Sequence, residues 1–229
     1  MAVTVLLLGL WIVQVYALET LQVSFNRTYV QVGRTEEVSG TLYYRARPER
    51  TVVRVEEPLK QWMVLEGGRL EIFYPEERRA FRILSKHPTN LPFFQAFLGA
   101  LKEDYGLRKS GYALLGHEVR GDTLLTYWNP PKKLKKALGR FTLAYVGDKI
   151  IRAELRGLRG ELLSRVLYGD HFPYAGAFLP LHIFTVRYTR SDTIYEEITY
   201  REPKCDFPLP EEVLQFRIPD DMEVEEVCW

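Results

Sequence analysis

The sequence predicts a single α+β domain, in which an incomplete, open antiparallel β-barrel of about ten strands is closed by one or two helices. Short segments rich in β-branched and aromatic residues follow one another along most of the 229 residues, and turn residues separate them. Helical spacing of apolar residues is confined to two short stretches, so the helices can cover the sheet but cannot replace it. The length suits one domain with a sizeable core.

Residues 40–83 give the clearest part of this pattern, an antiparallel meander. Leu70 and Ile72 alternate with Arg69 and Glu71, so one face of their strand is dry and the other is wet. Residues 61–65 are apolar on both faces, and we expect this strand to be covered twice, by a core and by a second segment lying over it. The turns between these strands contain Arg47-Pro48, Glu57-Pro58, Glu66-Gly67-Gly68 and Pro75-Glu76.

Further strands are expected on both sides of the meander, because β-rich segments and turn residues continue there. The expected ranges are 20–32 and 36–46 before the meander, and 111–119, 122–128, 139–146, 149–158, a hairpin across 181–201 and a last strand at 213–218 after it.

A helix is predicted over residues 91–105, inside the barrel or across its mouth. Asn90 can cap this helix and Pro92 suits its first turn. A second helix is expected at residues 159–167. The apolar residues that recur at helical spacing in the first helix are Leu91, Phe94, Phe97, Leu98 and Leu101.

The first 17 residues have the pattern of a signal peptide. Residues 2–13 are almost wholly apolar, and Val15-Tyr16-Ala17 follows them. A dozen apolar residues is too short to span a bilayer, which needs about 20, but suits a signal-peptide core before a small-residue cleavage site. We expect cleavage near Ala17, which leaves residues 18–229 as one exported, periplasmic domain. The alternative is a buried first strand.

Composition and motifs argue against several classes of function. The formal net charge of +1 does not suit a nucleic-acid-binding domain, which is usually clearly basic. The sequence has no Gly-x-Ser-x-Gly elbow, no phosphate-binding glycine loop and no spacing typical of metal ligands. Adjacent acidic residues such as Glu56 and Glu57 point to opposite faces of a strand. We therefore expect no enzyme, no catalytic residue, no metal and no cofactor.

Two features have alternative interpretations. Cys205 and Cys228, the only cysteines, either form a disulfide in an oxidising compartment or stay as free thiols. Residues 132–136, with the sequence Lys-Lys-Leu-Lys-Lys, form the one dense basic cluster. This cluster is either a solvated loop or a contact for anionic headgroups or an acidic partner.

The order of residues in the meander resembles the family of LolA-like periplasmic outer-membrane lipoprotein carrier proteins, which fold as LolA/LolB-like open barrels. The segment from Leu214 to Val224 is also similar to the closing strand of that family. The residues that carry the resemblance in the meander are, in order, Gly40, Arg47-Pro48, Glu57-Pro58, Gln61, Glu66-Gly67-Gly68 and Tyr74-Pro75.

One departure from the family pattern concerns the strand before Glu57-Pro58. Members usually carry an Arg followed by an aromatic residue there, and Val52 and Val53 occupy these places. In the best-known branch that Arg is associated with holding a lid over the cavity. Arg54, on the same strand face as Val52, is the substitute that the sequence offers.

The resemblance implies a monomeric carrier that shuttles acyl chains of lipoproteins, or a related lipid, toward the outer membrane. Its partners would be an inner-membrane release transporter and an outer-membrane acceptor. Buried acyl chains gain about 0.8 kcal/mol per CH₂, so an apolar cavity between the sheet and the 91–105 helix would suffice. The alternatives are an envelope-stress sensing module of the same fold and a hydrolase. The expected cavity residues are Trp62, Val64, Leu70, Ile72, Phe94, Phe97, Leu98 and Phe141.

Overall fold

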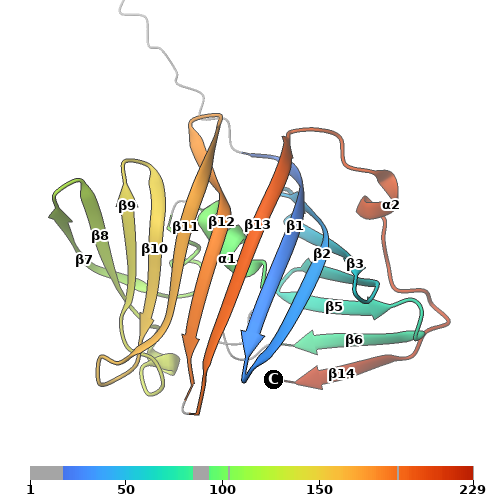
Figure 1. Cartoon of the computed structure of the whole chain (residues 1–229), viewed down its shortest axis with the longest axis horizontal. Helices are drawn as coiled ribbons and strands as arrows, with labels where there is room; N and C mark the ends of the chain where they lie inside the picture. Colours follow the sequence, from blue (N-terminus) through green and yellow to red (C-terminus); the bar gives the residue numbers. More distant parts are fainter. Residues whose placement is uncertain (1–17, 85–92, 103, 190, 229) are drawn as a thin grey trace, which may run out of the picture.

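The computed structural model of the chain describes residues 18–84, 93–102, 104–189 and 191–228, and places all strands of this part in one sheet (Figure 1). The fourteen strands follow the spatial order β14-β6-β5-β4-β3-β2-β1-β13-β12-β11-β10-β9-β8-β7. The terminal strands β14 and β7 do not pair, so the sheet is open, as predicted. The number of strands is larger than the ten expected.

Neighbouring strands are antiparallel, except that β14 runs parallel to β6. The strands are β1 (Thr20–Gln31), β2 (Arg34–Arg45), β3 (Arg50–Glu57), β4 (Gln61–Glu66), β5 (Arg69–Tyr74), β6 (Arg79–Leu84), β7 (Ala113–Arg120), β8 (Thr123–Asn129), β9 (Phe141–Val146), β10 (Lys149–Arg156), β11 (Leu162–Tyr174), β12 (Ala177–Tyr188), β13 (Thr193–Cys205) and β14 (Val224–Cys228).

Two short α-helices and one 3₁₀ turn complete the described part of the chain. Helix α1 (Gln95–Ala100) lies behind β11, β12 and β13 in the view of Figure 1, and α2 (Glu211–Leu214) lies at the opposite end from β7. The 3₁₀ turn (Lys132–Leu134) follows β8. We call the face of the sheet that packs against α1 the inner face and the other one the outer face.

The inner face carries the main hydrophobic core. Strand alternation brings one apolar side chain in two from most strands onto this face, where they meet α1. The fully buried members include Leu21, Val23, Leu42, Val53, Leu143, Ile183 and Ile198.

The outer face of β2–β5 is covered by the segment that follows β13. Val52 and Val64 are buried there against Leu209 and Val213. Trp62 stacks on Phe216, with the ring centroids 4.4 Å apart. The strand at residues 61–65 is therefore covered on both sides, as its two apolar faces predicted.

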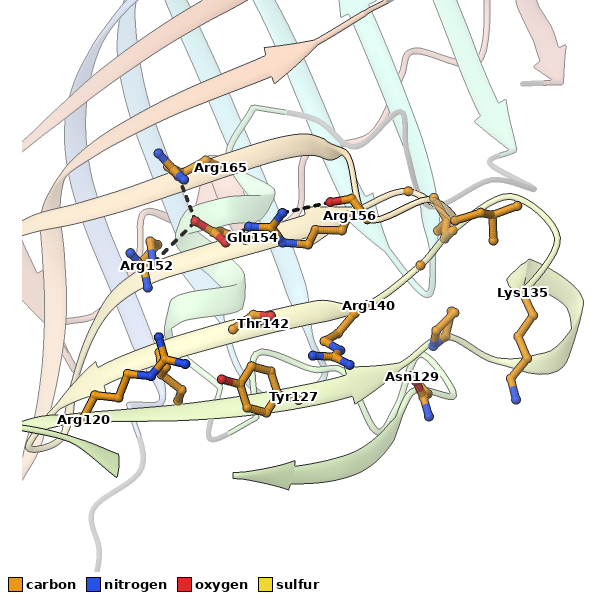
Figure 2. A pocket seen from close by; sticks show the side chains of 17 residues that line it. Arg120, Tyr127, Asn129, Lys135, Arg140, Thr142, Arg152, Glu154, Arg156 and Arg165 are labelled. Atoms are coloured by element: carbon orange, nitrogen blue, oxygen red, sulfur yellow. Dashed lines mark hydrogen bonds and ion pairs between the residues drawn. The ribbon is translucent and has the colours of Figure 1, made fainter. Parts of the chain in front are cut away.

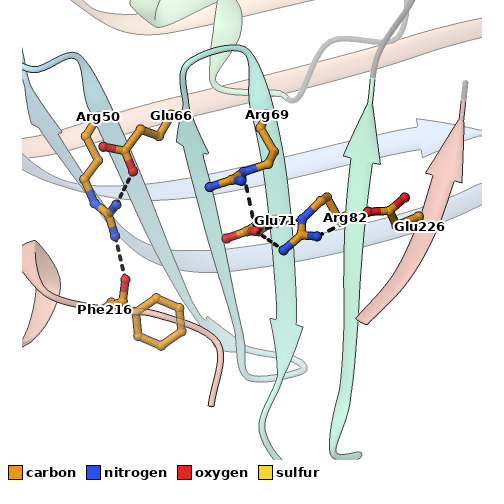
Figure 3. A network of polar contacts seen from close by, with 7 residues as sticks. All are labelled: Arg50, Glu66, Arg69, Glu71, Arg82, Phe216 and Glu226. Carbon is orange, nitrogen blue, oxygen red and sulfur yellow. Dashed lines mark hydrogen bonds and ion pairs between the residues drawn. The ribbon is translucent and has the colours of Figure 1, made fainter. Parts of the chain in front are cut away.

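Ion pairs join the C-terminal segment to the same outer face (Figure 3). Arg50 donates hydrogen bonds to Glu66 and, at 2.6 Å, to the carbonyl oxygen of Phe216. Arg82 bridges Glu71 on β5, 3.0 Å away, and Glu226 on β14, 3.2 Å away. The chain end is thus held by a stacked aromatic pair, strand pairing and charge.

Three expectations for individual elements were wrong. The helix expected at 159–167 is instead the start of β11, because this segment pairs with both β10 and β12 and fills the sheet between them. The strand expected at 213–218 is α2 and an irregular segment, and the last strand lies further on, at β14. The predicted helix 91–105 is confined to Gln95–Ala100 in the described part of the chain. Asn90, Leu91 and Pro92 lie outside the described residues, as does the expected signal peptide.

The two cysteines of the expected disulfide lie on different strands, Cys205 at the end of β13 and Cys228 at the end of β14. Cys205 is a free cysteine, and the Cys228 side chain lies outside the described part. Figure 1 shows β13 running up to the loop that leads to α2, whereas β14 ends near the opposite end of the sheet. A disulfide needs Cα atoms within about 7 Å of each other. The pairing stays a prediction, and these strand positions disfavour it.

Gly40 is required by a close approach of β2 to β3. The register between these strands shifts at Ser39/Gly40, and a Cβ atom at position 40 would collide with the carbonyl oxygen of Arg54. Backbone atoms cannot move aside as a flexible side chain can.

We therefore predict that Gly40→Ala lowers the free energy of unfolding by about 1–3 kcal/mol, as for other overpacked sites. Urea unfolding followed by circular dichroism measures this change. Gly116→Ala is the matched control, because nothing lies within 4 Å of a Cβ atom at that strand position. Equal stability of both variants would contradict the close approach.

Candidate functional site

The candidate site lies between the inner face and α1, where the sequence predicts an apolar cavity. The helix has six residues and buries Phe97 and Leu98. Phe94, at its N-terminal cap, and Phe97 are completely buried. Gly99 allows the ring of Tyr105 to lie on the helix, since a Cβ there would be 2.7 Å from that ring.

Aromatic contacts hold α1 on the sheet. The ring of Phe97 stacks on Tyr200 of β13, with the centroids 4.2 Å apart. Phe93, which precedes the N-terminal cap of the helix, lies 5.2 Å from Phe25 of β1, measured between the ring centroids. Aromatic pairs of this kind contribute about 0.5–1.5 kcal/mol each beyond their buried area. The helix is therefore a packed part of the core in this structure.

Two tyrosines add a polar attachment. The Tyr168 hydroxyl lies 3.3 Å from the Ala96 carbonyl oxygen and 2.7 Å from the Tyr105 hydroxyl. Burial raises the pKa of Tyr105 to about 12 and the pKa of Tyr168 well above its ordinary value. Both hydroxyls therefore stay protonated at neutral pH and can donate hydrogen bonds.

The segment after α1 is tied to the turn between β2 and β3. Lys102 donates a hydrogen bond of 2.7 Å to the carboxylate of Glu49, and Lys109 donates one of 3.0 Å. The bond from Lys102, assisted by that from Lys109, lowers the pKa of the Glu49 carboxyl despite its partial burial. Ion pairs thus fasten one end of the segment that contains α1.

A buried ionic group lies on the inner face beside the helix. Arg27 of β1 pairs with Glu196 of β13 at 2.6 Å, and Arg187 of β12 lies 3.6 Å from the same carboxylate. The Arg27 guanidinium also lies 5.1 Å from the centre of the Phe93 ring. The hydroxyl of Tyr200 is buried with no hydrogen-bond partner in the described structure. The apolar site therefore has a polar boundary.

The structure brings together most of the expected cavity residues. Phe94, Phe97 and Leu98 belong to the inner core, and Leu70 and Phe141 pack against it. Ile72 lies on the same face of β5 as Leu70 and is half-buried.

Trp62 and Val64 belong to the outer cluster instead, under Leu209 and Val213. They were placed wrongly in the cavity, because a strand that is apolar on both faces does not reveal which face meets the helix. Met63 and Leu65, their neighbours on β4, face the inner core.

Arg54 also lies on the outer face, where its guanidinium is 5.9 Å from the Trp62 ring and 2.9 Å from Glu56. It cannot substitute for an arginine that holds α1. The arginine that does contact this segment is Arg27, which the sequence analysis missed. The inward position of Arg27 could have been predicted from the alternation of side chains in β1. Leu21, Val23 and Phe25 face inward, and Arg27 is the next residue in that series.

In the described structure, side chains of α1 pack directly against the apolar side chains of the inner face. Hollows of about 890 and 280 Å³ lie elsewhere in the described structure, and no residue of α1 lines either of them. Across the described ranges, no group of three His, Cys, Asp or Glu side chains could hold a metal ion. No helix among the described residues has the length and apolarity to cross a bilayer.

Solved structures of three other proteins share this architecture. A LolA superfamily protein from Nitrosomonas europaea matches with a TM-score of 0.61 and 17% identity, covering 88% of this chain and 92% of that chain. The fold is LolA-like.

A DUF1329 family protein from Desulfovibrio piger matches the LolA-like fold with a TM-score of 0.66 and 14% identity, over 87% of this chain and 90% of that chain. A domain assigned to outer-membrane lipoprotein sorting from Vibrio parahaemolyticus matches with a TM-score of 0.66 and 12% identity, over 86% and 89%. No family model and no curated protein matches the sequence. At these identities the likeness concerns the fold, which agrees with the resemblance in the meander.

The attachment at Glu49 predicts a pH-dependent contribution to stability. Because the carboxyl pKa is lowered in the folded state, the contribution is present above the ordinary carboxyl pKa and is lost as the pH falls through the folded value. Glu49→Gln should lower the free energy of unfolding at pH 7 by about 0.5–1 kcal/mol, since the site is partly exposed. The difference from wild type should shrink as the pH falls below the ordinary carboxyl pKa and the Glu49 carboxylate takes up a proton.

Urea unfolding across this pH range measures the effect, and Glu57→Gln, at an exposed position without an ion-pair partner among the described residues, is the control. A difference for Glu49→Gln that is the same at acid and neutral pH would show that the ion pairs are not its cause.

Proposed function

We propose that the protein is a periplasmic carrier that binds the acyl chains of lipoproteins, or of a related lipid, between the inner face and α1 and moves them toward the outer membrane. The proposal rests on how the inner face and α1 are arranged. An open sheet presents a wide apolar inner face, and a six-residue helix covers part of it, with completely buried phenylalanines at its N-terminal cap (Phe94) and within it (Phe97).

Loading in this proposal requires α1 to leave its position. The side chains of Phe94, Phe97 and Leu98 occupy the apolar surface that acyl chains would cover. A bound acyl chain compensates for the lost contacts, since each buried CH₂ contributes about 0.8 kcal/mol. When cargo binds, its acyl chains replace the side chains of α1 as the apolar cover of the inner face.

The polar boundary of the site suits the head of such a cargo. Arg27 and the unpaired Tyr200 hydroxyl lie next to the aromatic contacts of the helix. Both can donate hydrogen bonds to ester or amide carbonyl oxygens, which join acyl chains to a lipoprotein or lipid. The proposal needs no catalytic residue and no cofactor.

Export and partners are part of the same proposal. Residues 1–17 would act as the signal peptide, and the mature domain would receive cargo from an inner-membrane transporter and deliver it to an outer-membrane acceptor. The fold similarity to the structure assigned to lipoprotein sorting in Vibrio parahaemolyticus supports this placement at the level of the superfamily.

Phe97→Glu tests the site. The substitution places a charge where an acyl chain should lie, and an unpaired buried charge is strongly unfavourable. We expect at least a tenfold weaker affinity for a fluorescent long-chain fatty acid, and loss of the lipid that mass spectrometry detects with the wild-type protein purified from a bacterial periplasm.

Phe207→Glu, the same change at an exposed phenylalanine, is the matched control and should bind as wild type. Leu101→Glu, at a half-buried position directly after α1, is a second variant that removes less of the core. Wild-type retention of lipid by a folded Phe97→Glu protein would show that α1 does not line the site.

A further inference from the structure

The larger hollow lies on the outer face of β8–β11, on the other side of the sheet from α1 (Figure 2). Thr142, Glu154 and Arg165 point into this region, and the residues next to them, Leu143, Ala153 and Val166, belong to the inner core. The hollow measures about 890 Å³ and is open to solvent. The loop after β8 and the turn after β10 border it.

Its lining is strongly cationic. Six basic side chains and one carboxylate, that of Glu154, line the hollow, which gives an excess of five positive charges (six minus one). Arg120 pairs with Glu118, which lies outside the lining, so the excess is four when that residue is included. The basic residues are Arg120, Lys135, Arg140, Arg152, Arg156 and Arg165.

One buried carboxylate organises half of these cations. Glu154 has 8% of its side chain exposed and lies 2.9 Å from Arg165, 3.2 Å from Arg156 and 3.6 Å from Arg152. A single negative charge cannot neutralise three guanidinium groups. Glu154 therefore positions these arginines on the strand surface and leaves donor groups available to a further anion.

Two observations show that the charge is not satisfied within the described structure. The Nε atom of Arg152 is buried and has no hydrogen-bond partner, since 3.6 Å is too long for a bond to Glu154. Buried polar atoms of this kind normally have a partner. Lys135 and Arg140 have no ion-pair partner among the described residues; Arg140 lies instead 5.1 Å from the centre of the Tyr127 ring.

The donor set fits one chemical class. Guanidinium groups bind phosphate through two parallel hydrogen bonds, and arginine is enriched wherever phosphate is recognised in this way. The hydroxyl of Thr142 and the amide of Asn129 add neutral donors around the same space, whereas the Tyr127 hydroxyl already donates to Glu118.

We propose that this hollow binds a phosphate group, carried either by a lipid headgroup or by a free phosphate compound. Leu158, which lines the hollow, and Leu167, which pairs directly with Arg152 across β10 and β11, are 59% and 42% exposed. Exposed apolar side chains beside phosphate-binding arginines suit a headgroup whose acyl chains lie at the protein surface. Lys135 places one residue of the basic cluster 132–136 in this site.

The test compares two double variants with the same change in net charge. Lys135→Ala/Arg140→Gln removes two exposed cations from the hollow, and Lys136→Ala/Arg159→Gln removes two exposed cations outside it. Isothermal titration with inorganic pyrophosphate probes free phosphate. Co-sedimentation with vesicles of phosphatidylcholine, with and without phosphatidylglycerol, probes a lipid headgroup.

We expect the first variant to weaken binding at least tenfold and the second less than twofold. Arg152→Gln, which removes the unpaired Nε atom, should weaken binding to a similar extent as the first variant. Binding to pyrophosphate alone assigns the site to free phosphate compounds, and binding to phosphatidylglycerol vesicles assigns it to a lipid headgroup. Each of these results supports the site.

Wild-type protein that binds neither probe would overturn the proposal, as would equal weakening by both double variants, since that would reflect net charge alone. The outcome is independent of the acyl-chain site, because all substituted residues lie outside the inner core and the probe pyrophosphate carries no acyl chain.

Discussion

Burial of Phe94 and Phe97 against the inner face is the interaction on which the rest of the structure depends. An open sheet of fourteen strands has an apolar face that water would otherwise contact, and the sheet cannot close to hide it. A helix of six residues is too short to be stable by itself. Its stability comes from packing on the sheet, and the sheet in turn needs the helix as a cover. The proposed loading by acyl chains would exchange the side chains of the helix for another apolar cover of the same face.

The same strands present different kinds of side chain on the two faces of the sheet. In β9–β11 the side chains alternate between the apolar core and the arginine-lined hollow, so Ala153 and Glu154 face opposite surroundings although they are adjacent. In β3 and β4 both faces are apolar, and the chain after β13 covers the outer one. The position of the C-terminal segment thus decides which part of the outer face is covered.

The features of this fold that depend on residues close together in the sequence could be predicted. The meander, its turns and the inward position of Phe94, Phe97 and Leu98 follow from periodicity, and the resemblance to LolA-like proteins agrees with the fold. The faces of Trp62 and Val64 could not be predicted, because they depend on Leu209 and Val213, which lie about 145 residues further on. The strand β11 was missed for a similar reason: its apolar spacing suits a helix, and pairing with both neighbours decides the outcome.

The pairing of β1 with β13 has a consequence for how the chain folds. This ladder joins the two halves of the sheet and aligns Phe25 with Tyr200. Pairing β1 with β13 closes a loop that contains most of the other strands, and closing such a long loop costs conformational entropy. Folding that depends on contacts between residues far apart in the sequence is slow. The central ladder cannot form until β13 has been synthesised, after all the other strands except β14. Until then the chain has only its local hairpins, so the domain stays incompletely folded throughout most of its synthesis.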